Sequence, residues 1–176
     1  MAITYSIRMD VVSHGLWGSL AFGRKNKRSF LLAFFFGIAP DLFSFGPFFI
    51  GSFLGIWRRP PFSTQPPPES AIPSFVHLLY RPTHSVIIFA AVFLLVWLIR
   101  KKPLWAMTAW GLHILFDIPL HTEHFFPTPF LWPLSSYTVD GWNWGNPWIF
   151  FPNIALLAIL YSWFFVKRRP YVARDI

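Results

Sequence analysis

The sequence predicts an all-α membrane protein, a polytopic helical bundle of about four or five spans with two external loops. Composition is the first reason, because 55% of the 176 residues are apolar, only 12% are charged and the mean hydropathy is +0.47. A single small soluble core does not require so much apolar sequence. The second reason is that the apolar residues occur in long runs. The third is that most basic residues cluster at the ends of these runs.

Five apolar runs are the candidate spans, and we interpret the whole chain, residues 1–176, as one membrane-embedded domain. The runs are Ile7 to Phe22, Ser29 to about Leu54, Val86 to Ile99 with an extension over Thr83 to Ser85, Leu104 to Leu120, and Trp148 to Val166. The first run is only moderately apolar, so whether it spans the membrane stays open. Pro40 and the pair Gly46-Pro47 should break the second run, since proline lacks the amide donor. Thr83, which follows Pro82, is expected to cap the third run.

Short basic clusters predict how the spans are oriented. The clusters contain Arg24, Lys25, Lys27 and Arg28, then Arg100, Lys101 and Lys102, and then Lys167, Arg168 and Arg169. If all three face the cytoplasm, the connections at about residues 55–82 and 121–147 lie outside and the carboxyl terminus is cytoplasmic. Topology therefore explains the formal charge of +8, and no nucleic-acid partner is expected.

Ionisable residues inside the apolar runs need a specific explanation, because an unpaired one costs at least about 2.5 kcal/mol in hydrocarbon. They are the pair Asp10 and His14, the pair His113 and Asp117, and the single residues Asp41 and His84. The members of each pair are four residues apart and so share one helix face. At about 1.5 Å per helical residue, all six lie roughly 15 to 24 Å from the nearest basic cluster. One shared metal site is the simplest explanation for this layer.

The sequence therefore predicts a bound divalent ion. The chain has no cysteine, so His, Asp and Glu are the only plausible ligands, and such donors suit zinc, while Mn or Fe would accept the same set. The predicted ligands are His14, Asp41, His84, His113 and Asp117. Asp41, His84 and Asp117 are also the predicted catalytic residues.

Five further residues are weaker candidates for a role beside the ligands. Asp10 would orient the neighbouring histidine of its pair. Arg81 would meet a substrate phosphate, or it simply extends to the interface as a cation. Glu123 would be a general base, or it is a solvated loop residue. His121 and His124 would bind a second metal or move protons in the outer loop.

Several motifs resemble those of a known family, the predicted membrane-bound metal-dependent hydrolases of bacterial inner membranes. They are Pro40-Asp41 at a helix break, T-H-S at Thr83 to Ser85, H-I-L-F-D at His113 to Asp117, the later Leu131-Trp132-Pro133, and His14 followed by Gly15. The order of motifs matches over roughly residues 10 to 135. The resemblance implies an inner-membrane location and a hydrolase activity. A more remote similarity, in ligand order alone, is to zinc-dependent phospholipases C.

The chain departs from that family at two places. It reads P-D-L-F-S from Pro40 to Ser44 where family members often read P-D-x-D-H, so Phe43 and Ser44 replace an acid and a histidine. It also reads L-L-Y-R-P at residues 78–82, where the family carries H-R-G before T-H-S. The number of metal ions and the catalytic competence of the site therefore stay open.

Together these features lead us to expect a hydrolase that acts on an ester or phosphoester. A bound divalent ion lowers the pKa of a water toward about 7 and polarises the electrophile. The depth of the ligands favours membrane lipids or a lipid-linked molecule as substrate. Two alternatives stay open. A metal or proton transporter would use the same residue types at successive depths, and a non-catalytic membrane scaffold would use His113 and Asp117 only to hold helices together.

Overall fold

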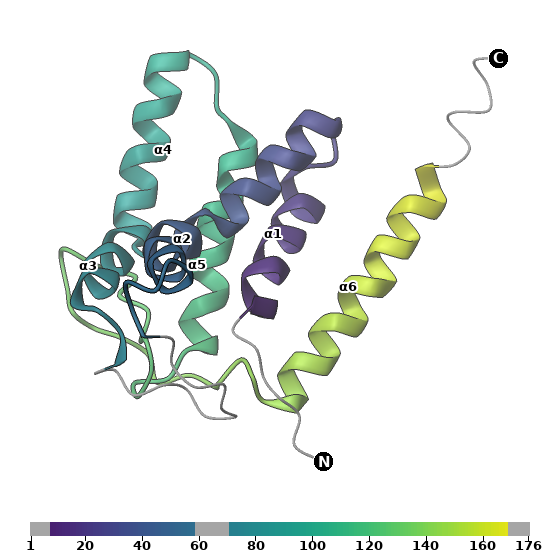
Figure 1. Cartoon of the computed structure of the whole chain (residues 1–176). Coiled ribbons are helices and arrows are strands. Elements are labelled where there is room, and N and C mark those ends of the chain that lie inside the picture. The colour runs from purple at the N-terminus through teal and green to yellow at the C-terminus, as the bar shows by residue number, and fades with distance from the viewer. Residues whose placement is uncertain (1–7, 59–70, 169–176) are drawn as a thin grey trace.

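The computed structural model describes residues 8–58 and 71–168, and this part of the chain is all-helical (Figure 1). The helices are α1 (Arg8–Phe22), α2 (Lys27–Phe53), α3 (Ser74–Thr83), α4 (Val86–Arg100), α5 (Thr108–Leu120) and α6 (Pro147–Arg168), with a short 3₁₀ helix, η2 (Trp105–Met107), before α5. No β-strand occurs among the described residues. The predicted all-α class is confirmed.

Two helices are long and apolar enough to cross a membrane, namely α2 and the Pro147–Val166 part of α6. A third span arises if α3 and α4 are counted together, since they meet at a short break with a bend of 58°. α1 has 15 residues and α5 has 13. At 1.5 Å per residue each is about 20 Å long, shorter than a hydrocarbon core of about 30 Å. By length and composition the structure therefore contains two or three candidate spans, which is consistent with a membrane protein.

The helix ends that carry basic clusters lie at one end of the molecule. In Figure 1 the turn between α1 and α2, the end of α4 and the end of α6 all lie toward the top of the view. The first of these turns is rigidly built. Asn26 Oδ1 accepts a hydrogen bond from the Ser29 amide at 2.8 Å, and Ser29 Oγ accepts one from the Asn26 amide at 3.0 Å. This capping box starts α2 directly after the basic turn.

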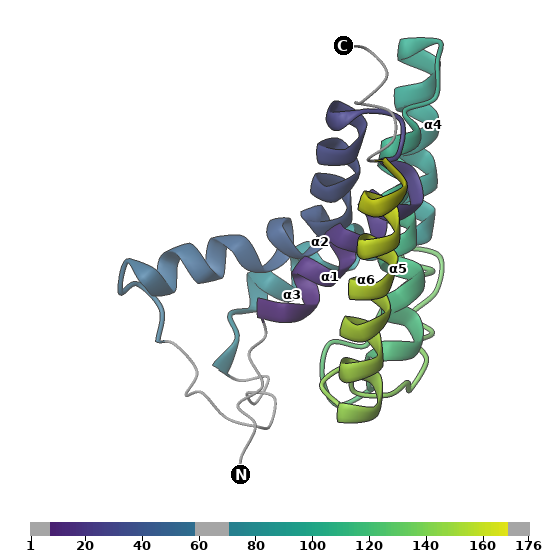
Figure 2. The same cartoon turned by 90° about the vertical axis from the view of Figure 1, so that its right-hand side faces the viewer.

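Pro40 lies inside α2 and does not end it. The helix continues through Pro40 and Pro47, so the predicted breaks at Pro40 and at Gly46-Pro47 are wrong as chain interruptions. Figure 2 shows instead that the second half of α2 turns away from the first. Pro40 cannot donate to the carbonyl of Phe36, and its ring crowds that carbonyl, which is the usual cause of such a kink. Asp41 follows the kink directly.

The predicted first external loop, residues 55–82, contains a helix. α3 occupies most of its second half, while residues 59–70 lie outside the described part of the chain. Two side chains four positions apart, Val76 and Tyr80, are buried against Phe48 of α2 and Phe126 of the later loop. An external loop was predicted here, but this apolar pair packs against a buried cluster, and that burial stabilises a helix.

Ser85, and not Thr83 as predicted, caps α4. Its Oγ accepts a hydrogen bond from the Ile88 amide at 3.2 Å. Thr83 ends α3 instead, where its hydroxyl donates to the carbonyl of Leu79 at 2.8 Å. The break between the two helices therefore falls at His84, whose side chain is completely buried in the bundle.

Small residues let α1, α2 and α5 approach one another closely. A Cβ atom on Gly37 would lie 2.5 Å from the carbonyl oxygen of His14, and one on Gly18 would lie 2.8 Å from the carbonyl oxygen of Ala33. Ala33 and Ala109 are buried where α2 meets the other two helices. Close backbone contact of this kind is common between membrane helices. It sets the spacing between the helices that carry His14, Asp41 and His113.

Residues 121–146 are non-helical, and these bounds are close to those predicted for the second loop. This loop forms hydrogen bonds with the ends of two helices. The Trp142 amide donates to the carbonyl of Pro119 at 2.8 Å, and the Val86 amide donates to the carbonyl of Phe130 at 2.9 Å. These bonds satisfy groups that a helix end leaves without an internal partner. The loop is thereby attached both to α5 and to the start of α4.

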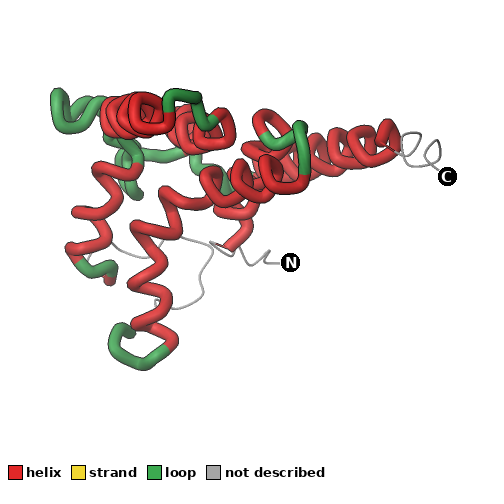
Figure 3. The backbone as a smooth tube through the Cα atoms, turned by 90° about the horizontal axis from the view of Figure 1, so that it is seen from above, coloured by secondary structure: helices red, strands yellow, loops and turns green. Residues whose placement is uncertain are grey.

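Polar contacts join α6 to α1. Trp17 Nε1 donates to Asn153 Oδ1 at 2.8 Å, and Asn153 Nδ2 donates to Ser13 Oγ at 3.0 Å. The Tyr161 hydroxyl donates to the carbonyl of Leu16 at 2.9 Å. Figure 3 shows α6, which leads to the carboxyl terminus, at the edge of the molecule. Hydrogen bonds can hold such a helix in lipid, where apolar burial contributes little to association.

Large apolar side chains cover much of the outer surface. No residue of α4 is buried. Phe53 is 78% exposed, Ile99 is 71% exposed and Trp148 is 87% exposed. Soluble monomers rarely expose continuous apolar surface of this extent. An apolar surface of this extent is compatible with contact with lipid.

Gly37→Ala should destabilise the protein, whereas Gly46→Ala in the same helix should not. The first substitution pushes a methyl group into the backbone of α1, and overpacking of this kind costs about 1 to 3 kcal/mol. A Cβ on Gly46 meets only the flexible Leu42 side chain, at 3.4 Å. Replacement of a helical glycine should then be neutral or stabilising by up to about 1 kcal/mol. Thermal unfolding of both variants in detergent, followed by tryptophan fluorescence, measures the difference, and equal melting temperatures would contradict the close approach of α1 and α2.

Candidate metal centre

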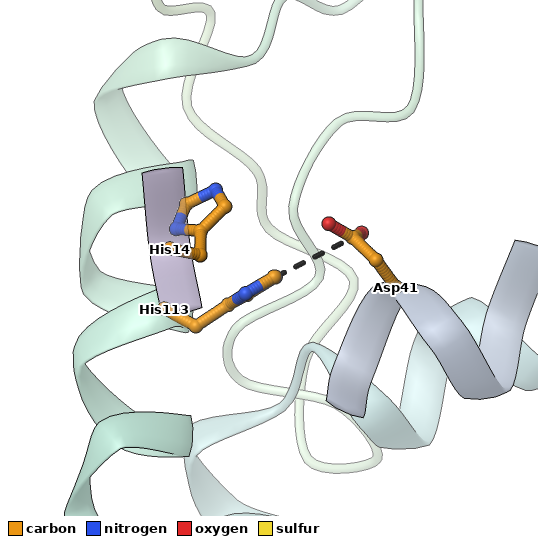
Figure 4. A group of neighbouring side chains, drawn as sticks. All are labelled: His14, Asp41 and His113. Atoms are coloured by element: carbon orange, nitrogen blue, oxygen red, sulfur yellow. Dashed lines mark ion pairs between the residues drawn. The ribbon is translucent and has the colours of Figure 1, made fainter. Parts of the chain in front are cut away.

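Four segments of the chain bring five ionisable side chains to one place. They are His14 of α1, Asp41 of α2, His84 at the break between α3 and α4, and His113 and Asp117 of α5. Figure 4 shows the rings of His14 and His113 side by side, with the Asp41 carboxylate facing them from α2. The side chains of His84 and His113 are fully buried, and that of Asp41 is 12% exposed.

Donor atoms of four of these residues face one another. His84 Nε2 and His113 Nε2 are 3.1 Å apart. Asp117 Oδ2 lies 3.0 Å from His113 Nε2 and 3.4 Å from His84 Nε2. Asp41 Oδ1 lies 3.4 Å from His84 Nε2 and 3.8 Å from His113 Nε2. Each carboxylate therefore approaches both imidazoles.

Hydrogen bonds on the far side of each ring determine its tautomer. His113 Nδ1 lies 2.6 Å from the carbonyl oxygen of Gly37, and His84 Nδ1 lies 3.1 Å from the carbonyl oxygen of Tyr80. A carbonyl oxygen can only accept, so each Nδ1 carries the hydrogen and donates it. In the neutral rings the lone pairs are then on the Nε2 atoms. Two lone pairs thus point at each other and at two carboxylates.

Such a group of atoms requires positive charge at its centre. Electron-rich atoms at these separations repel, and buried carboxylates are stable only when they are paired or bound to metal. Protonated imidazoles are one source of charge, and a single divalent ion, which would balance the two carboxylates, is the other. Donors of a tetrahedral zinc ion with bonds of about 2.0 to 2.1 Å are roughly 3.3 to 3.4 Å apart. The observed separations of 3.0 to 3.8 Å fit that geometry, so these residues could hold a divalent metal ion.

Two overlapping groups of donors are present, and they share one residue. The ligand atoms of His84, His113 and Asp117 all lie within 4.8 Å of one another, and so do those of His14, Asp41 and His113. With Nδ1 bonded to Gly37, His113 has a lone pair only on Nε2 and can serve one ion at a time. His14 Nε2 lies 3.1 Å from Asp117 Oδ1. This arrangement favours one ion, with His14 holding the second oxygen of Asp117.

Comparison with known proteins does not place this chain in a family. Searches against protein-family models, curated proteins and solved structures found no match to this chain. The chemistry of the centre is therefore argued from its own residues.

Phe43 and Ser44, which stand where the resembled family has an acid and a histidine, are not among the donors of the centre. Phe43 is 60% exposed on the outer side of α2. Ser44 is buried, and its hydroxyl donates to the carbonyl of Pro40 and lies 3.1 Å from Thr83 Oγ1. Ser44 therefore connects the kink of α2 to the end of α3. Its role in this structure is to hold the segments that carry Asp41 and His84.

Most of the weaker candidate residues lie away from the donors. Arg81, Glu123 and His124 are exposed, and none belongs to a donor group. Asp10 lies in the first turn of α1, but its side chain is outside the described residues. His121 is half-buried one helical turn beyond Asp117, and its Nδ1 contacts the Tyr80 hydroxyl at 2.8 Å and the Phe126 carbonyl oxygen at 2.9 Å. Of the four candidates whose side chains the structure describes, His121 is the one that contacts Tyr80, which packs on His84.

Sequence reasoning missed Tyr80. Its ring stacks on His84, with ring centroids 3.7 Å apart and an angle of 18° between the planes. The available signal was the spacing, because Tyr80 precedes His84 by one helical turn. That signal was not used, because residues 55–82 were predicted to be an external loop.

Protein purified in detergent without chelator should retain about one divalent ion per chain. His84→Ala and Asp117→Ala should each lose most of it, because each removes one donor from a small set and leaves the others without their partner. His124→Ala, at an exposed histidine outside the donor groups, is the matched control and should keep the wild-type content. Elemental analysis by mass spectrometry measures the ratio. Metal-free wild type would show that protonated imidazoles, and not a metal, balance the carboxylates.

Proposed function

We propose that this protein is a membrane-bound metal-dependent hydrolase with one zinc ion held by Asp41, His84, His113 and Asp117. One observation supports this most directly. The Nε2 atoms of His84 and His113 face each other at 3.1 Å between two carboxylates, and in the neutral rings, whose Nδ1 atoms donate to carbonyl oxygens, both Nε2 atoms carry lone pairs. The motifs that resemble those of bacterial inner-membrane hydrolases include the same four residues, and we propose that the chain belongs with them.

Each part of the centre has a task in this proposal. A divalent ion supplies an acidified water and a Lewis acid for cleavage of an ester or phosphoester. The carbonyls of Gly37 and Tyr80 orient the two imidazoles, which is the usual role of groups behind metal-bound histidines. His14 holds Asp117. Asp41 is the most exposed of the donors, so we assign the approach of substrate to its side of the centre.

We propose a lipid or a lipid-linked ester or phosphoester as substrate. The centre lies among helices whose outer faces are apolar. Leu42 and Phe43, the residues that follow Asp41, are 48% and 60% exposed. A molecule that reaches Asp41 along this part of α2 therefore meets apolar surface. A water-soluble substrate would lose hydration along that path without compensation.

The finer membrane arrangement is part of the same proposal. We propose four or five membrane-crossing segments, with α1 and α5 adding to the two or three candidate spans although each is short. The basic ends then face the cytoplasm, and the loop over residues 121–146 lies on the outer side of a bacterial inner membrane. Short helices are compatible with this arrangement if the bilayer thins locally around them.

A transporter is less well supported by the distribution of polar residues. In the described part of the chain the buried ionisable side chains are His14, His84, His113 and Asp117. All four belong to the centre. A conducting path needs such groups at successive depths, and the described residues provide them at one depth.

Hydrolysis should depend on Asp41 and on the metal. The protein, reconstituted in phospholipid vesicles, should cleave an ester or phosphodiester in a panel of phospholipids and lipid-linked phosphates. Chelation should abolish the activity and added zinc should restore it. Asp41→Asn should lower activity by at least about 100-fold, since changes even to groups behind the ligands cost about 10- to 100-fold.

Asp140→Asn is the matched control for that measurement. Asp140 is an exposed loop carboxylate that accepts a hydrogen bond from the Glu123 amide at 2.9 Å. Its substitution should leave activity within about twofold of wild type, since surface changes are usually worth no more than 0.5 kcal/mol. Activity that survives complete removal of metal would refute the hydrolase mechanism. Equal losses in the two variants would contradict the role of Asp41.

Cysteine labelling tests the orientation without background, because the chain has no cysteine. Ser136→Cys lies in the loop after α5 and Lys101→Cys lies in the basic turn after α4, and both positions are exposed. A membrane-impermeant thiol reagent should label Ser136→Cys in intact cells, and Lys101→Cys only after the membrane is permeabilised. The reverse pattern would place the loop over residues 121–146 in the cytoplasm.

A further inference from the structure

Tyr80 contacts the ligand His84 through both its side chain and its main chain. The two rings lie nearly parallel, at a centroid distance of 3.7 Å. The carbonyl oxygen of Tyr80 accepts two hydrogen bonds from His84, one from the backbone amide at 2.9 Å and one from ring Nδ1 at 3.1 Å. Thr83 Oγ1 also lies 3.0 Å from His84 Nδ1, but only Tyr80 combines a contact to that nitrogen with a ring stacked on the imidazole, among the contacts described for His84.

The other end of the Tyr80 side chain is also held. The Tyr80 hydroxyl donates to the Phe126 carbonyl oxygen at 3.2 Å and lies 2.8 Å from His121 Nδ1. His121 Nδ1 in turn lies 2.9 Å from the same carbonyl oxygen, so this nitrogen carries its hydrogen. The hydroxyl thus connects α3 to the start of the loop after α5. The phenol ring is fixed at both ends, with His84 against its face.

Core packing alone does not explain these contacts. Tyr80 belongs to a buried cluster with Phe48, Ile72, Val76 and Phe126, and a phenylalanine or leucine would fill that position. Packing in this cluster requires neither the hydroxyl bonds nor a stacked arrangement on a histidine. A buried hydroxyl needs partners, so tyrosine is costly at a site where only volume matters.

We infer that Tyr80 is a positioning residue of the proposed metal centre, holding the His84 ring so that Nε2 faces the other donors and linking that ring to the loop at His121 and Phe126. This inference rests on the proposed function, because positioning matters only if His84 binds an ion. Groups behind metal ligands typically contribute 10- to 100-fold to metal affinity. Tyr80 is therefore expected to affect the ion without touching it.

Binding of Co²⁺ alone to the full-length protein in detergent tests this inference, because the visible absorption of Co²⁺ reports the geometry of its ligands. Tyr80→Leu removes both the stacked ring and the hydroxyl, and it should weaken Co²⁺ binding about 10- to 100-fold and alter the spectrum. Tyr80→Phe keeps the ring and loses the hydroxyl bonds, so it should weaken binding about 2- to 10-fold. Phe48→Leu removes an aromatic ring from the same buried cluster, and it should lower the melting temperature with affinity and spectrum unchanged.

The outcomes separate this inference from the proposed function. If wild type binds no Co²⁺, the proposed metal centre fails and the role of Tyr80 fails with it. If wild type binds Co²⁺ and Tyr80→Leu binds it with the same affinity and spectrum, only the role of Tyr80 fails. Equal effects of Tyr80→Leu and Phe48→Leu on Co²⁺ affinity and spectrum would likewise show that Tyr80 contributes only packing. If Tyr80→Leu does not fold, Tyr80→Phe is the deciding variant. Co²⁺ affinity and a spectrum equal to those of wild type in Tyr80→Phe would then overturn the inference.

Discussion

Buried charge is the constraint on which the rest of this structure depends. Two carboxylates and three imidazoles meet among apolar helices, and the Nε2 atoms of His84 and His113 are 3.1 Å apart. Removing such groups from water costs several kcal/mol for each ion unless opposite charge is close by. A divalent ion would satisfy both carboxylates and both lone pairs at once. Without an ion, protonation of the imidazoles at Nε2 would have to supply that positive charge.

Irregular backbone places the donors. Asp41 follows the kink at Pro40, and His84 lies at the break between α3 and α4. The kink and the break each remove helical hydrogen bonds, which a membrane helix tolerates only where other groups satisfy the freed backbone atoms. The carbonyl of Gly37, one turn before Asp41, accepts from His113, and the carbonyl of Tyr80 accepts from His84. Carbonyls within one turn of each irregularity therefore also hold the two imidazole rings.

Close helix packing and hydrogen bonds hold the donors of the centre in place. α1, α2 and α5 approach one another at glycine and alanine, so the distances between their side chains have little freedom. The loop over residues 121–146 is hydrogen-bonded to the end of α5 and to the start of α4. Tyr80 connects that loop to His84 from within. A hydrolase benefits from ligands that are held before substrate arrives, whereas a transporter needs groups that exchange an ion between sites.

Composition and spacing by themselves determined that this protein is helical and suited to a membrane, and that His113 and Asp117 share a helix face. They also placed His14, Asp41 and His84 at a similar depth, because rise per residue is a local property of the helix. Only the tertiary structure decided that residues 74–83 form a helix, that Pro40 kinks α2 without ending it, and that Ser85 caps α4. It also decided which backbone carbonyl each imidazole meets and that Tyr80 stacks on His84. The reason is physical: Gly37 and His113 are 76 positions apart, and no local pattern records which carbonyl will meet which ring once the helices pack.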